Sequence, residues 1–113
     1  MSGQSRVLER KVFYANTKIF AEGEAGDRAY LIQDGTVEII KNGQVLAELS
    51  KGELFGEMAL VDDQPRMASA RAKNDVSVVI IGRETFREKL SKADPFIRGL
   101  LTIFVRNIRN LSR

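Results

Sequence analysis

Residues 11–83 contain many short segments rich in β-branched and aromatic residues, and turn-forming residues separate them at close, regular spacing. Asn42 and Gly43 form the strongest short hairpin signal in the chain. Residues 76–81 are the richest in β-branched side chains. This spacing predicts a mainly β domain of the sandwich, barrel or roll type. The segment after the hairpin signal alternates apolar with polar residues, as a half-buried strand does, at Val45, Ala47 and Leu49.

The periodicity of apolar residues becomes helical after about residue 83. Residues 84–91 are predicted to form one helix, with Phe86 and Leu90 one turn apart. Asp94 as N-cap and Pro95 in the first turn predict a second helix over residues 95–112. We therefore expect one domain, residues 1–113, with two C-terminal helices. The second helix carries a wide apolar stripe at Ile97, Leu100, Leu101, Phe104, Val105, Ile108 and Leu111.

The chain contains no cysteine and no histidine. Disulfides, thiolate metal sites and nucleophiles activated by histidine are therefore excluded. No pair of carboxylates has a spacing that points to acid–base catalysis. We expect no catalytic residue, no metal site and no cofactor, so an enzyme is the function class that the sequence favours least.

The net charge of +3 is unevenly distributed along the chain. Residues 95–113 contain four arginines and no acidic residue, whereas the remainder has 14 basic and 15 acidic residues, a net charge of −1. A solvated helix face is the favoured interpretation of this basic segment. A nucleic-acid binder is less favoured, since no recognition motif or interleaved exposed aromatics accompany it. No apolar run is long enough to span a membrane and no signal peptide is recognisable, so we expect a cytoplasmic protein or a cytoplasmic part of a larger one.

The segment from residue 52 to residue 72 carries the candidate chemistry. Gly56 allows a sharp turn into a short helix near Glu57, and a helix N-terminus offers free amides to an anion. Arg66 supplies a planar donor fork that suits phosphate, and Glu57 offers an acceptor to a sugar hydroxyl. The alternative is structural: the helix start packs into the core, and Arg66 forms a surface ion pair with Asp62, Asp63 or Glu57. These residues alone leave both interpretations open.

Two motifs in this region resemble those of a known family. Residues 55–60 read Phe-Gly-Glu-Met-Ala-Leu, and residues 66–69 read Arg-Met-Ala-Ser after a short spacer. They resemble the phosphate-binding cassette of the cyclic nucleotide-binding domain family, which includes catabolite-activator-type regulators, protein kinase A regulatory subunits and cyclic nucleotide-gated channels. A glycine-containing pattern over residues 22–37 resembles the family's upstream signature. The resemblance implies an antiparallel, jelly-roll-like β-roll over about residues 11–83, with an inserted cassette helix and two C-terminal helices.

The resemblance also implies roles for individual residues. Glu57 would accept a hydrogen bond from the ribose 2′-hydroxyl, and Arg66 would pair with the cyclic phosphate. Met67 departs from the family pattern, which usually has a small or hydroxyl residue there. Because a hydroxyl at this position is associated with cyclic GMP, we expect cyclic AMP to be favoured over cyclic GMP. The predicted ligand-binding residues are Gly56, Glu57, Met58, Ala59, Arg66, Met67, Ala68 and Ser69.

In the family, the last helix closes over the base of the nucleotide. Counting from Arg66 places this lid contact near Asn107, Ile108 and Leu111. We expect the bound ligand to favour one position of this helix, which would report to a homodimer partner or an attached effector. The alternatives are that these residues are ordinary core, or that the roll is a protein-interaction module without a ligand.

Overall fold

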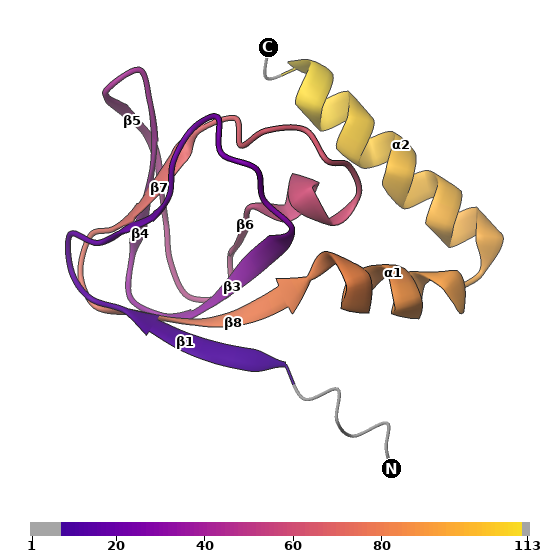
Figure 1. The fold of residues 1–113 in the computed structure, drawn as a ribbon, viewed down its shortest axis with the longest axis horizontal. Helices are drawn as coiled ribbons and strands as arrows, with labels where there is room; N and C mark the ends of the chain where they lie inside the picture. The colour runs from indigo at the N-terminus through magenta and orange to yellow at the C-terminus, as the bar shows by residue number, and fades with distance from the viewer. Residues whose placement is uncertain (1–7, 112–113) are drawn as a thin grey trace.

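The computed structural model describes residues 8–111, without the side chains of Val105, Ile108, Arg109 and Leu111. Strands occupy most of the chain before residue 83, and two helices follow (Figure 1). The strands are β1 (Glu9–Phe13), β2 (Lys18–Phe20), β3 (Arg28–Asp34), β4 (Val37–Lys41), β5 (Gln44–Leu49), β6 (Leu54–Phe55), β7 (Ser69–Ala72) and β8 (Val76–Gly82). The helices are η2 (Glu57–Leu60, of the 3-10 type), α1 (Arg83–Ser91) and α2 (Pro95–Leu111).

The strands form two antiparallel four-stranded sheets. Their orders are β1-β8-β3-β6 and β2-β7-β4-β5, so strands that are distant in sequence become neighbours. In the first sheet, Val78 of β8 is paired with Lys11 on one side and with Ile32 on the other. The helix η2 is inserted between β6 and β7, which belong to different sheets. The predicted antiparallel β-roll with an inserted cassette helix and two C-terminal helices is confirmed.

Residues with a left-handed backbone make the tight turns that this topology needs. Asn42 and Gly43 have φ angles of 53° and 76° and join β4 to β5. Two consecutive positive φ angles match the twist of a two-residue hairpin, which is why asparagine followed by glycine predicts one. Asn16, between β1 and β2, has φ 69°, and its side chain tolerates that conformation.

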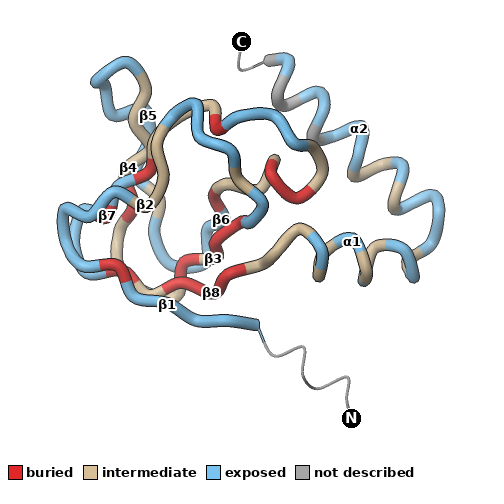
Figure 2. The backbone as a smooth tube through the Cα atoms, viewed as in Figure 1, coloured by how far each residue is buried: buried red, intermediate tan, exposed pale blue. Residues whose placement is uncertain are grey.

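The core lies between the two sheets. Figure 2 shows the buried segments concentrated on β3, β8 and η2. Ile32, Val37, Val76 and Val78 are the largest side chains with less than 2% exposure. Tyr30 stacks on Phe55 with ring centroids 5.0 Å apart, at the end of the core nearest to η2. Phe55 of this pair also lines a cavity next to Glu57, the first residue of η2.

The predicted half-burial of β5 is correct at Leu49, which is partly buried and packs against the core, but it is wrong at Val45 and Ala47. Val45 and Leu46 are 49% and 60% exposed, and Ala47 is exposed as well. The reason is that β5 is the last strand of its sheet and pairs only with β4. One side of this strand borders a cavity instead of packed core.

The two helices differ in how they are held. α1 continues directly from β8 and packs against η2. α2 begins where the Asp94 carboxylate accepts a hydrogen bond of 2.7 Å from the Phe96 amide, which confirms the predicted N-cap. Along α2, Phe96 is 72% exposed and Phe104 is 53% exposed. None of the helices in the described part of the chain has the length and apolarity needed to cross a membrane.

Candidate functional site

The site begins at the turn between β6 and η2. Gly56, the N-cap of η2, has φ 73°, which a residue with a Cβ rarely adopts. A Cβ at this position would also approach Nη1 of Arg66 to 2.8 Å. The predicted sharp turn into a short helix at Glu57 is therefore confirmed, and it brings the backbone of Gly56 against the Arg66 side chain.

Arg66 is the one charged residue among the fully buried residues that the structure describes, with 8% exposure. Its Nη1 donates to the Gly56 carbonyl at 3.2 Å, and its Nη2 donates to the Arg28 carbonyl at 3.0 Å. The guanidinium lies over the Phe20 ring, 4.0 Å from the ring centroid. Its Nε is buried and has no hydrogen-bond partner. Within the described residues Arg66 forms no ion pair, so the surface ion pair left open by the sequence is not what the structure has.

The loop between β2 and β3 holds Arg66 from the other side. The Arg66 amide donates to the Glu24 carbonyl, and the Gly23 amide donates to the Arg66 carbonyl, both at 2.8 Å. Gly26 packs directly against the Arg66 guanidinium, so that a side chain at this position would collide with it. The position of the cation is thus set by backbone contacts from both flanking loops.

As a result, the Arg66 guanidinium is a buried cation that forms no ion pair with the described residues. Burial lowers the pKa of Arg66, and the nearby Tyr30, Asp27 and Glu24 partly offset this effect. An arginine nevertheless stays protonated in proteins. A buried cation is unfavourable unless it is paired, so an anion bound at this point would be stabilised by Arg66.

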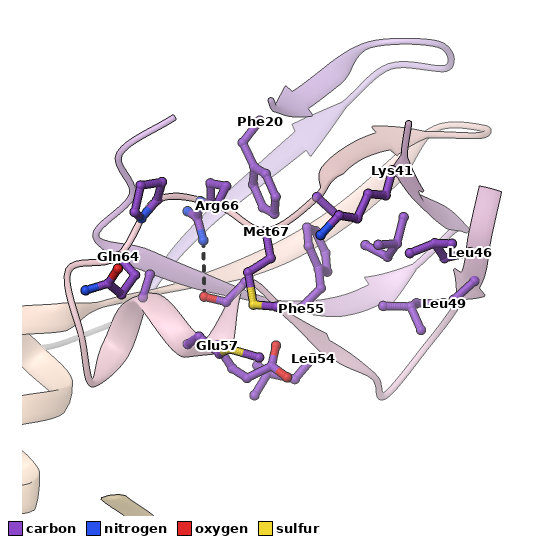
Figure 3. Close-up of a pocket in the computed structure, with 17 residues that line it drawn as sticks. Phe20, Lys41, Leu46, Leu49, Leu54, Phe55, Glu57, Gln64, Arg66 and Met67 are labelled. Atoms are coloured by element: carbon purple, nitrogen blue, oxygen red, sulfur yellow. Dashed lines mark hydrogen bonds between the residues drawn. The ribbon is translucent and has the colours of Figure 1, made fainter. Parts of the chain in front are cut away.

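A cavity of about 390 Å³ opens beside this cation (Figure 3). Its volume lies in the range typical of small-molecule sites. Arg66, Glu57, Gln64 and Lys41 supply its charged and polar side chains, and in Figure 3 the Lys41 side chain extends from β4 toward the cavity. Its apolar wall comes from Phe20, Ile39, Leu46, Leu49, Leu54, Phe55, Met58 and Met67. A cation and an acceptor next to an apolar wall suit an anionic ligand with hydroxyl groups and a flat apolar part.

Most of the predicted ligand-binding residues lie together in this cavity. Its lining includes Gly56, Glu57, Met58, Ala59, Arg66, Met67 and Ala68. Ser69 is not part of the lining, because it starts β7 and its hydroxyl accepts a hydrogen bond from the Glu22 amide at 2.9 Å. Asn107 is exposed on α2 and also lies outside the lining. The side chains of Ile108 and Leu111, the other predicted lid residues, are outside the described part of the chain.

Sequence reasoning missed the wall opposite the cassette. Ile39 and Lys41 come from β4, and Leu46 and Leu49 come from β5. Leu46 was the available signal, because it is apolar where strict alternation with Val45 and Ala47 requires a polar residue, so both faces of this strand carry apolar side chains. The described residues contain no group of three or more acidic side chains that would hold a metal ion.

Comparison with known proteins agrees with this geometry. The model of the family described as "Cyclic nucleotide-binding domain" matches residues 10–93. The cAMP-dependent protein kinase regulatory subunit of Aspergillus niger is 41% identical over 93 residues, which cover 80% of this chain and 23% of that protein. The corresponding subunit of Yarrowia lipolytica is 40% identical over 85 residues, covering 74% and 23%. This chain therefore spans less than a quarter of the length of these relatives.

Solved structures share the fold. The cAMP-bound form of the EAL enzyme Bd1971 superposes with a TM-score of 0.79 at 37% identity, covering 91% of this chain and 29% of that one. Its cGMP-bound form gives a TM-score of 0.80 at 38% identity, covering 89% and 28%. The catabolite activator protein of Thermus thermophilus gives 0.76 at 31% identity, covering 92% and 51%.

Proposed function

The chain belongs to the cyclic nucleotide-binding domain family, and we propose that residues 1–113 form a single sensor domain that binds a cyclic nucleoside monophosphate in the cytoplasm. Its role is regulatory and not catalytic. The observation that carries the proposal is the buried, unpaired Nε of Arg66 beside the 390 Å³ cavity. A cyclic phosphate supplies both the charge and the acceptor that this guanidinium lacks.

The neighbouring residues support the same ligand. Gly56, Ala59 and Met67 line the cavity. The backbone amides of Gly56 and Met67 would donate to phosphate or sugar oxygens, whereas the Ala59 amide already donates to the Gly56 carbonyl at 3.2 Å. The Glu57 carboxylate lines the cavity and would accept from the ribose 2′-hydroxyl. The apolar wall beyond these groups would then contact the purine, because a flat and weakly polar base suits an apolar surface.

We further propose that cyclic AMP is favoured over cyclic GMP. Met67 lines the cavity directly after the cassette arginine and has no hydroxyl to offer to a guanine. Two curated relatives that are 41% and 40% identical are named as cAMP-dependent. A structural neighbour has been solved with either nucleotide, however, so the fold itself accepts both.

The output of the sensor is proposed to run through α2. A ligand that contacts this helix in one position only would shift its population toward that position. The exposed apolar residues of α2, including Phe96 and Phe104, would then meet a homodimer partner or an attached effector. In this view Asn107, Ile108 and Leu111 form the lid over the base.

Calorimetric titration with cyclic AMP and cyclic GMP tests the proposal. Arg66→Ala should weaken binding by about 1.5–3 kcal/mol, roughly ten- to a hundredfold, because a charge-assisted hydrogen bond is lost. Glu57→Ala should also weaken binding. Arg71→Ala is the matched control. Arg71 lies on β7, the strand after the cassette, is exposed, and pairs with Glu38 away from the cavity. If Arg66→Ala and Glu57→Ala bind like a parent that binds a cyclic nucleotide, the cassette is not the binding site. If the parent binds neither nucleotide, the domain is a ligand-free interaction module instead.

A further inference from the structure

A second arginine contacts the cassette without lining the ligand cavity. Arg83 is the first residue of α1 and is only partly exposed. Its Nε donates to the Ala59 carbonyl at 2.6 Å. Its Nη2 donates to the Gly26 carbonyl at 2.6 Å and to the Asp62 carbonyl at 3.0 Å. Arg83 does not line the cavity and has no carboxylate partner among the described residues.

The carbonyls that Arg83 binds explain what it does. Ala59 lies in the last turn of η2, and Asp62 follows its C-cap, Val61. The last carbonyls of a helix have no partner within the helix, and a cation near them is stabilised. A helix of four residues has little internal hydrogen bonding to keep it in shape. Arg83 therefore fixes the C-terminal end of η2, while Gly56 at the N-terminal end faces the cavity.

The third carbonyl links Arg83 to the cassette arginine. The Gly26 carbonyl accepts a hydrogen bond from Arg83, and a Cβ at Gly26 would collide with the Arg66 guanidinium. The Arg83 amide also donates to the Asp27 carbonyl at 2.7 Å. Gly26 thus lies between the two arginines. A shift of Arg83 would displace both η2 and the loop at Gly26, which together position Arg66.

We propose that Arg83 is a positioning residue that keeps the cassette in its binding shape and ties that shape to the start of α1. This inference rests on the proposed function, because it concerns the same site. α1 leads into α2, so the three hydrogen bonds of Arg83 connect the phosphate end of the cavity to the helices. Only a guanidinium presents donors in a fork that reaches three carbonyls in different directions.

The first measurement is amide hydrogen exchange of the cassette without any ligand. The amides of Val61 and Asp62 both donate to the Met58 carbonyl, and the Ala59 amide donates to the Gly56 carbonyl. In Arg83→Ala these amides should exchange faster by about tenfold or more. The amides of β3 and β8 should keep their protection. Arg87→Ala is the matched control, because it removes the same charge one turn along α1 from an exposed position, and it should change neither set.

The second measurement is affinity for cyclic AMP by calorimetry. Arg83→Ala should bind about tenfold or more weakly, Arg83→Lys should fall between Arg83→Ala and the parent, and Arg87→Ala should match the parent. Unchanged cassette exchange and unchanged affinity in Arg83→Ala would overturn the proposal. Global unfolding of both Arg83 variants would also overturn it, because Arg83 would then support the whole roll. Failure of the parent to bind any cyclic nucleotide would refute the proposed function, whereas the exchange experiment would still decide whether Arg83 orders the cassette.

Discussion

The roll and the helix α2 both carry many apolar residues, but they use them in different ways. In the roll, Ile32 and Val78 are 1% and 0% exposed, enclosed by neighbours from both sheets. On α2, Phe96 and Phe104 are 72% and 53% exposed, and Figure 2 shows most of this helix in the exposed class. Stability therefore resides in the roll, whereas α2 retains apolar surface that is available for another contact. None of the α2 side chains that the structure describes is buried, and an element with few buried contacts can change position at small cost in free energy.

The largest expected difference between these regions is in stability. Ile32→Ala should lower the free energy of unfolding by about 2–5 kcal/mol, because it leaves a cavity between the packed sheets. Phe104→Ala should change it by about 0.5 kcal/mol or less, since the ring is already half exposed. Urea denaturation of the two variants and the parent measures both values. A loss of similar size in Phe104→Ala would mean that α2 belongs to the core.

Removing the end of α2 tests the same contrast through ligand binding. A chain that ends at Asn107 lacks the proposed lid residues Ile108 and Leu111. The roll should remain folded, while affinity for cyclic AMP should fall by about tenfold, because the base loses apolar cover worth about 1–2 kcal/mol. A chain that ends at Leu111 serves as the control and should bind like the parent. Equal affinity of both truncated chains would refute the lid, and unfolding of the shorter chain would make the end of α2 structural.

The same contrast explains what could be predicted from the sequence. Local signals were sufficient for individual turns and helix starts. Asn42 and Gly43 form a hairpin turn, Asp94 caps α2, and Gly56, with a φ of 73°, makes the turn into η2. These features depend on a few adjacent residues and on backbone sterics. The family motif located the cassette side of the cavity because that side is also built from residues close together in the sequence.

What could not be predicted depends on residues that only the fold brings together. Phe20 lies under the Arg66 guanidinium, 46 positions earlier in the chain, and no spacing rule connects the two. Arg83 reaches Gly26 across 57 positions. The apolar stripe of α2 predicted a helix, but a stripe does not state which surface covers it. Long-range contacts of this kind follow from sheet order, which short sequence patterns do not specify.

A smaller effect is expected at the cavity wall, where nucleotide choice is proposed to be set. Met67→Thr adds a hydroxyl next to Arg66 and should shift the ratio of cyclic GMP to cyclic AMP affinity toward cyclic GMP by about fivefold, the value of one added hydrogen bond near 1 kcal/mol. Met67→Leu is the control of similar size without a hydroxyl and should leave the ratio unchanged. Competition binding with the two nucleotides measures it. A clear preference of the parent for cyclic GMP would contradict the proposed cyclic AMP selectivity.

The smallest expected effect is on how stability depends on pH, and it compares a tyrosine inside the roll with one on its surface. Burial raises the pKa of Tyr30, and the nearby Arg66 and Arg28 partly oppose this shift. Tyr30 is 6% exposed, whereas Tyr14 on the surface is 70% exposed. Because the unfolded chain releases the Tyr30 proton near pH 10 while the folded chain still holds it, the folded state binds more protons in that window. Stability should therefore fall as the pH rises above about 10, and this slope should be smaller in Tyr30→Phe but unchanged in Tyr14→Phe. Urea denaturation of the three proteins between pH 8 and pH 11 measures the slopes, and an equal slope in the parent and in Tyr30→Phe would contradict a raised pKa of Tyr30.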